Sequence, residues 1–490
     1  MDVKPVLRGL RKFSRQSRLS VVSCRHNEAA ELALTESVKF VCSSGAVGSG
    51  IHLPAFRAAM ERQPDFVASD AGTIDAGPYH LGVGKGAYAT EAMRHDLEIL
   101  LTEVPKGTPV LVGSADTAGG DPHVDRTLDI IKDIVSQHGL KRRIAVIRSE
   151  LDPAMLQNAY DDGRVVALDH APALDRDGIG RSTRIVGMMG VEPLQEALQE
   201  DVDFILAGRC SDSALFAALP IMRGIPEGLA WHAGKIVECG TLTCETYGKG
   251  AMFGELFADH GIITPLGEGL RCTPQSVASH SLYENGDPYL HRESSGTLDI
   301  TDAQFEQYDP VSVRISGARY IPADRPSIKL EGVEFAGYQS MLMGGIRDPF
   351  IIRQFDKWLA EVKDEVRQRA ARLLGDVLSP KDWRIDTHAY GHNAVMGARE
   401  PSHAHPPHEI GLAFCLSAPT QELANKLAEL SRQPLLHHPI PEWSGSITGF
   451  ACLFNQAHVE RGPYWRFSMH HVLLPAPDET VFRREILTLG

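Results

Sequence analysis

The stretch TPVLV (108–112), GSADTAGGDPHVD (113–125) and LDIIKDIV (128–135) decides the fold class of this chain. A short apolar run predicts a strand, and apolar residues at helical spacing predict a helix. Between them lies a glycine-rich loop with three aspartates and one histidine. Strand, polar loop and helix in this order are typical of open α/β folds, which bind ligands at the carboxyl ends of their strands.

The same order recurs on both sides of this stretch. Apolar runs at 38–42, 66–69, 144–147, 165–168 and 204–207 alternate with segments of helical spacing at 56–62, 90–104, 153–161 and 191–199. Strands that alternate with helices predict an α/β fold with a mostly parallel sheet flanked by helices. We expect this domain to cover residues 38–378.

The two ends of the chain differ from this pattern. Beyond Pro380 we expect strands at 383–390, 409–416, 448–454 and 464–473 and a helix at 420–431, which predicts a small α+β, ferredoxin-like domain over residues 383–490. Residues 1–37 form a basic N-terminal extension with one acid before Glu28. This extension is interpreted as a disordered tail, with a mitochondrial targeting peptide or an upstream start codon as the alternatives.

Composition excludes several classes of function. The chain has 490 residues, 43% of them hydrophobic, and a formal net charge of −14. This charge argues against nucleic acid as a partner, and no apolar stretch is long enough to span a membrane. The eight cysteines form no Cys-x-x-Cys pair, and we interpret them as reduced thiols. We therefore expect a cytoplasmic protein.

The loop at 113–125 contains the first group of candidate catalytic residues. Asp116, Asp121 and His123 are candidates for acid/base catalysis, and Ser114 is a candidate for substrate binding. Asp121, His123 and Asp125 are also candidate ligands of a divalent cation, because carboxylate and imidazole suit such ions. The alternative is that Asp121, followed by Pro122, only caps the next helix.

Two glycine-rich loops follow neighbouring strands. Asp70 ends one strand and is a further catalytic candidate, while backbone N–H groups and a lysine in these loops are suited to an anionic group. The candidate substrate-binding residues are Gly45, Gly48, Thr73, Asp75, Tyr79 and Lys85. The alternative for these segments is a glycine-rich surface loop.

A third polar loop follows the strand at 204–207. Arg209 is a candidate clamp for a carboxylate, and Asp212 is a candidate binding residue or a helix N-cap. Lys235 and Glu238 stand three positions apart and are interpreted as a solvated ion pair. Cys239 has no activating neighbour in the sequence, which argues against a nucleophilic thiol. The loop at 113–125 and the loops after Asp70 and Ala207 follow strands of one predicted sheet, so we expect one composite site.

Several runs resemble one known family. They are SDAGT (69–73), GSA (113–115), GMMGVEP (187–193), AGR (207–209), AALPIMRG (217–224), GKIVECG (234–240) and RCTPQSVA (271–278). Together they resemble the acyclic terpene utilisation (AtuA) family over residues 38–375, and the tail from 385 resembles the small ferredoxin-like domain often attached to it. The resemblance implies catabolism of branched acids through CoA thioesters and implies no residue roles.

The residues and the resemblance together predict a catabolic enzyme that acts on a small carboxylic acid or acyl-CoA. We expect a lyase or hydratase that uses acid/base chemistry. The alternatives are an isomerase on the same substrates, and a non-catalytic subunit or ligand-binding scaffold of a two-component enzyme. No cofactor is assigned; a divalent cation, and CoA as part of the substrate, are candidates. The expected partner is a small molecule, with a second copy of the chain or a small partner subunit as further candidates.

Overall fold

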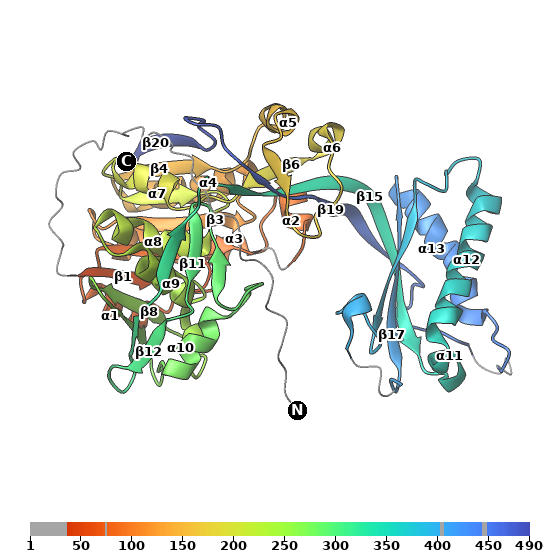
Figure 1. Ribbon diagram of the computed structural model, residues 1–490. Coiled ribbons are helices and arrows are strands. Elements are labelled where there is room, and N and C mark those ends of the chain that lie inside the picture. Colours follow the sequence, from red (N-terminus) through yellow and green to blue (C-terminus); the bar gives the residue numbers. More distant parts are fainter. Residues whose placement is uncertain (1–36, 74–75, 402–405, 443–447) are drawn as a thin grey trace, which may run out of the picture.

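The computed structural model describes residues 37–73, 76–401, 406–442 and 448–490. The described chain forms a large α/β lobe and a smaller lobe, joined by a long two-stranded ribbon (Figure 1). The basic extension expected at 1–37 lies, apart from Ser37, outside the described residues. Among the described helices, none combines the length and apolarity that crossing a membrane requires.

A ten-stranded mixed sheet forms the centre of the large lobe. Five neighbouring strands run parallel: β1 (Val38–Cys42), β2 (Phe66–Gly72), β3 (Val110–Thr117), β7 (Phe204–Ala207) and β4 (Arg142–Arg148). Antiparallel strands extend this centre on both sides: β8 (Ala251–Leu256), β9 (Gly261–Leu266), β13 (Val313–Ser316), β12 (Gln304–Gln307) and β20 (Arg483–Leu489). The expected mostly parallel sheet is therefore corrected to a mixed one. The connection from β8 to β9 is too short for the crossover that a parallel pair needs.

Helices cover both faces of the parallel strands. One face packs against α7 (Glu192–Leu198), α8 (Asp212–Met222) and α9 (Glu227–Val237), and the other against α1 (Leu53–Met60), α3 (Thr90–Glu103) and α4 (Asp121–His138). Successive strand residues such as Phe40 and Val41 point to opposite faces, and both are fully buried. Strands buried on both faces read as continuous apolar runs, which is why the sequence revealed them.

Shorter elements surround this core. They are α2 (Tyr79–Val83), α5 (Pro153–Asp161), β5 (Val165–Ala167), α6 (Arg176–Arg181), β6 (Arg184–Gly187), η1 (Gly240–Thr243), α10 (Pro274–Ser281), β10 (Leu290–Arg292), β11 (Gly296–Asp299) and β14 (Arg319–Pro322). The expected strand at 165–168 forms as β5, but it pairs antiparallel with β19 instead of joining the large sheet.

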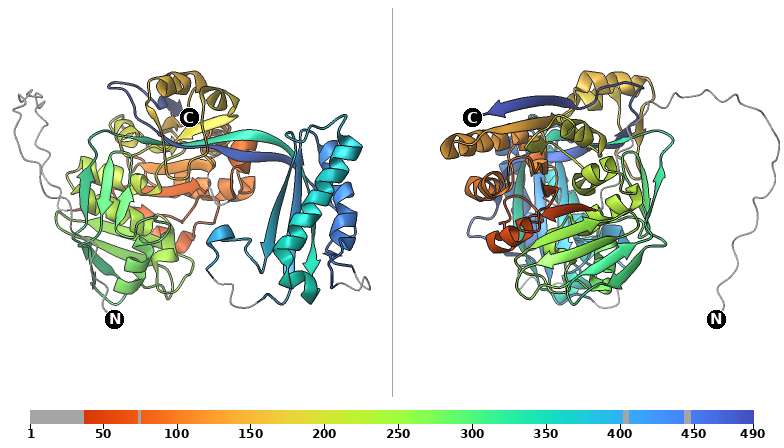
Figure 2. Two further views of the ribbon diagram at one scale, coloured as in Figure 1. Left: turned by 45° about the vertical axis from the view of Figure 1, so that its right-hand side comes forward. Right: turned by 90° about the vertical axis from the view of Figure 1, so that its left-hand side faces the viewer.

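The small lobe is built on the ribbon. Its long strands β15 (Ile328–Ile346) and β19 (Val459–Leu473) pair antiparallel and extend through both lobes (Figure 2). Its other elements are α11 (Pro349–Arg353), α12 (Phe355–Leu374), β16 (Arg384–Tyr390), η2 (Gly397–Arg399), β17 (Ile410–Ala418), α13 (Gln421–His437) and β18 (Ala451–Cys452). Helices α12 and α13 pack against the strands through Trp358, Phe414 and Leu427.

Segments on both sides of residues 378–383 contribute to both lobes. Strand β15 and helix α12 already belong to the small lobe's sheet and helix layer, whereas β20 returns to pair with β4 in the large sheet. A ferredoxin-like fold is not confirmed for this lobe. Its main elements follow as strand, helix, strand, strand, helix, strand, and the first and last of these strands continue into the large lobe.

Candidate functional site

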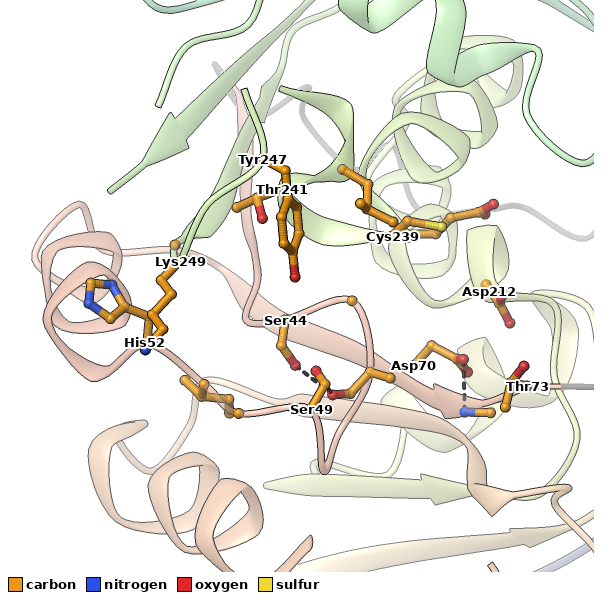
Figure 3. Close-up of a pocket in the computed structure, with 18 of the residues that line it drawn as sticks. Ser44, Ser49, His52, Asp70, Thr73, Asp212, Cys239, Thr241, Tyr247 and Lys249 are labelled. Carbon is orange, nitrogen blue, oxygen red and sulfur yellow. Dashed lines mark hydrogen bonds between the residues drawn. The ribbon is translucent and has the colours of Figure 1, made fainter. Parts of the chain in front are cut away.

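A pocket of about 900 Å³ opens at the carboxyl ends of β1, β2 and β7. Its lining comes from the loops after these strands, from the end of α9 and from η1 (Figure 3). This volume lies within the range of small-molecule sites. The polar and charged lining residues include Ser44, Ser49, His52, Asp70, Thr73, Arg209, Asp212, Glu238, Lys249 and Glu284.

The loop after β1 is held by a buried aspartate. Asp96 of α3 is fully buried, and its carboxylate accepts hydrogen bonds from the backbone N–H groups of Gly48, Gly50 and Ile51 at 2.7, 3.0 and 2.8 Å. Gly48 has a φ of 99°, and a Cβ atom there would lie 2.8 Å from the ring of Tyr88. This anchored loop fixes one wall of the pocket, and Gly48 supports it without lining the pocket.

Two carboxyl groups meet in the pocket. Asp70 at the end of β2 and Asp212 at the start of α8 both line it, and each has one buried carboxyl oxygen without a hydrogen-bond partner among the described residues. Burial, and then the charge of Asp212, raise the pKa of Asp70 well above its ordinary value. Burial also raises the pKa of Asp212, although the positive charge of Arg209 opposes this. Both carboxyl groups are therefore easier to protonate than an exposed aspartate.

The positive charge of Arg209 favours the ionised form of Asp212. Its guanidinium donates to both oxygens of Glu331, at 3.0 and 3.3 Å, and to the hydroxyl of Ser114 at 3.2 Å. Burial alone would raise the pKa of Glu331, but the charges of Arg209 and Lys329 lower it to about 2. Arg209 lines the pocket but is already paired with Glu331, and its role as a clamp for a ligand carboxylate stays a prediction.

A second charged group lies at the end of α9. The Lys235 ammonium donates to Glu238 Oε1 at 2.5 Å, and the Ser213 hydroxyl donates to Glu238 Oε2 at 2.6 Å. Both charged side chains are buried, so the interpretation as a solvated ion pair is wrong. Burial raises the pKa of Glu238 to about 7, although Lys235 opposes the increase. This carboxyl group can take up or release a proton near neutral pH.

The pocket has an acidic end and a basic end. Asp70 and Asp212 lie at one end, while Lys249 and His52 lie at the other (Figure 3). Lys249 forms no ion pair with any residue in the described ranges, and His52 Nδ1 is buried there without a hydrogen-bond partner. Cys239 also lines the pocket, but burial, and then the charge of Glu238, raise the pKa of its thiol. A protonated thiol is a poor nucleophile.

The structure brings together part of the residues predicted from the sequence. Gly45, Asp70, Thr73, Arg209 and Asp212 line the pocket, and Ser114 lies directly behind it. Tyr79 and Lys85 lie outside the lining, and Asp75 falls outside the described residues. The neighbouring glycines serve packing: a Cβ atom at Gly82 would lie 2.2 Å from Trp465, and one at Gly86 would lie 1.8 Å from Asp116.

The catalytic and metal-binding candidates of the 113–125 loop lie outside the pocket lining. Asp116 has a left-handed backbone with a φ of 47°, and both its carboxylate oxygens accept from Arg126 at 2.7 Å. Asp121 begins α4 and pairs with Arg483 at 2.6 Å, and Asp125 pairs with Arg148 at 2.7 Å. His123 is buried 3.2 Å from the carbonyl of His80, and burial lowers its pKa.

These residues do not form a joint site. Within the described ranges, no three His, Cys, Asp or Glu residues are grouped as a metal site would need. The catalytic role of Asp116, Asp121 and His123 stays a prediction to which the pocket geometry adds no support. Sequence reasoning missed Ser44, Lys249 and Glu331, and it misread Glu238; the only signal for Glu238 was its place in the GKIVECG run.

The fold and the pocket define a two-lobed α/β protein with a ligand-sized site at the strand ends of a mixed sheet. The comparison with protein families then identifies it further. Residues 42–442 match the family described as acyclic terpene utilisation family protein AtuA, and the chain belongs to this family. The comparisons found no matching curated protein and no matching solved structure.

Proposed function

We propose that the strand-end pocket is the active site of a cytoplasmic catabolic enzyme that acts on a small carboxylic acid or its CoA thioester. The observation that carries this proposal is the group of three buried carboxyl groups in one pocket, Asp70, Asp212 and Glu238, whose pKa values burial raises, that of Glu238 to about 7. Acids and bases poised near neutral pH are typical of catalytic sites. The family's association with acyclic terpene utilisation is consistent with such substrates.

The reaction class that fits best is addition or elimination of water, a lyase or hydratase reaction. In elimination, a carboxylate removes the proton next to the carbonyl, and a carboxylic acid protonates the departing hydroxyl. Protonated Asp70 would act as the acid, and the Asp212 or Glu238 carboxylate as the base. An isomerase would use the same groups to move one proton between two carbons. Lys249 and His52 at the other end would bind the anionic part of the substrate.

A non-catalytic ligand-binding subunit is the second candidate. The observation that favours it is the small lobe, which extends from the large lobe on the ribbon of β15 and β19 and offers a surface for a partner chain (Figure 1). We propose that this lobe has a ferredoxin-like fold and serves assembly with a second copy or a small partner subunit.

Turnover of a panel of hydroxy acids, unsaturated acids and their CoA esters tests the proposal. Asp70→Asn and Asp212→Asn should each reduce kcat by at least about a hundredfold, which is the usual contribution of one acid/base group. Asp125→Asn is the matched control, because Asp125 pairs with Arg148 outside the pocket. Full activity of both pocket variants would refute the assigned roles. Ligand binding without turnover, with activity gained on adding a second polypeptide, would favour the subunit.

A further inference from the structure

A second pocket lies beside the first, against α10. It has a volume of about 500 Å³ and is lined by residues of α10, its N-cap, and the segment that follows η1. Leu242 and Tyr283 line both pockets. Leu242 is 53% exposed and Tyr283 is 45% exposed, so the residues shared by the two pockets lie at the protein surface and not in the core. One extended ligand can therefore occupy both.

His280 lines this second pocket and has one ring nitrogen that is not used in a hydrogen bond within the described residues. The residue is only 7% exposed, and its Nε2 atom is buried without a hydrogen-bond partner among the described residues. Its ring stacks on Tyr283 with centroids 5.6 Å apart. Burial, and then the charge of Lys235, lower the pKa of His280 to about 4, so its imidazole is neutral at pH 7. A buried polar atom left unpaired is costly, and a ligand group that pairs with it is favoured.

The rest of the second pocket is polar but nearly uncharged. Gln275 and Ser279 lie at its exposed rim, whereas the hydroxyls of Thr273 and Ser276 are used in the capping box of α10. Its only acid is Glu245, whose carboxylate is paired with Arg271. Leu242 and Cys244 contribute apolar surface. This lining suits an uncharged chain in which polar groups alternate with methylenes.

We propose that the second pocket binds an uncharged, amide-bearing segment of the ligand whose reacting carbonyl lies between Asp70, Asp212 and Glu238. An amide carries both a donor and an acceptor, so it pairs with His280 Nε2 in either neutral tautomer. Gln275 and Ser279 at the rim offer further hydrogen-bonding groups to such a segment. Placement of the reacting end rests on the proposed function; binding of the amide segment in the second pocket does not.

Calorimetric titration of the full chain with pantetheine, an uncharged thiol with two amides, tests this site. The wild-type protein should bind, and His280→Phe should weaken binding about tenfold, because it keeps the ring stack on Tyr283 but removes the nitrogen. The matched control is His291→Phe, since His291 is also a buried histidine but lines neither pocket. Gln275→Ala, at an exposed position, should weaken binding several-fold with unchanged thermal unfolding.

Other outcomes overturn the site. They are no pantetheine binding to wild-type protein, equal binding by His280→Phe, or His280-dependent binding of glucose in place of pantetheine. Asp70→Asn separates the two proposals, because it should bind pantetheine like the wild type even if it turns nothing over. If the wild-type protein binds pantetheine but turns over none of the tested acids and CoA esters, the second pocket is supported and only the proposed reaction is refuted.

Discussion

Replacing Glu331 by glutamine should destabilise the protein at pH 7 by about 3 kcal/mol. The carboxylate is buried against Arg209, and the charges of Arg209 and Lys329 lower its pKa from 4.5 to about 2. A shift of this size corresponds to about 3 kcal/mol of unfolding free energy. Removing one partner of a buried ion pair costs a similar amount, because the other charge stays buried without compensation.

The pH dependence of this loss has a definite sign. A carboxyl group whose pKa is lower in the folded state stabilises the protein above its unfolded pKa, and this contribution disappears as the pH falls through the folded pKa. The difference between wild type and Glu331→Gln should therefore be about 3 kcal/mol at pH 7 and about 1 kcal/mol at pH 3. Urea unfolding at both pH values, followed by circular dichroism, measures it.

Glu334→Gln provides a matched control on the same strand. Glu334 pairs with Arg466, whose side chain is 53% exposed, and such pairs contribute about 1 kcal/mol or less. If Glu331→Gln destabilises no more than Glu334→Gln at pH 7, or if its effect does not shrink at pH 3, the assignment of Glu331 as the buried counter-ion of Arg209 is refuted.

Three further predictions concern the pocket and the loop at 113–125. If Glu238 is the base, kcat/KM of the wild type should rise between pH 6 and 8, since the pKa of Glu238 is about 7. Glu238→Gln should lack this rise, and a pH profile of this variant equal to that of the wild type would exclude Glu238 as the base. Asp96→Asn should destabilise the protein by about 2 kcal/mol, because the amide has only one oxygen and cannot accept the three backbone hydrogen bonds that the two carboxylate oxygens accept. Hydrogen exchange should accelerate at Gly48, Gly50 and Ile51, and unchanged exchange there would contradict the anchoring role. Asp116→Asn should lower thermal stability through the lost charge opposite Arg126, yet leave kcat within about twofold; a much larger loss of kcat would restore Asp116 as a catalytic residue.

The sequence alone determined the alternation of strands and helices. The strands at 38–42 and 204–207 and the helix at 153–161 form with the predicted bounds, because burial on both sheet faces and a proline at the helix start leave local signals. The sequence also located the strand-end loops after β1, β2 and β7, which contribute Gly45, Asp70 and Asp212 to the pocket. These features depend on the periodicity of apolar residues and on residues that are close together in the sequence.

Only the tertiary structure decided which charged groups are available for chemistry. The carboxylate that binds Arg209 belongs to Glu331, 122 residues away, and the arginine that binds Asp121 is Arg483, 362 residues away. Whether a carboxylate meets water, an arginine or another carboxyl group depends on such long-range contacts, and these set its pKa. For the same reason, the loop at 113–125 reads as a catalytic cluster in the sequence, yet its aspartates lie in ion pairs outside the pocket.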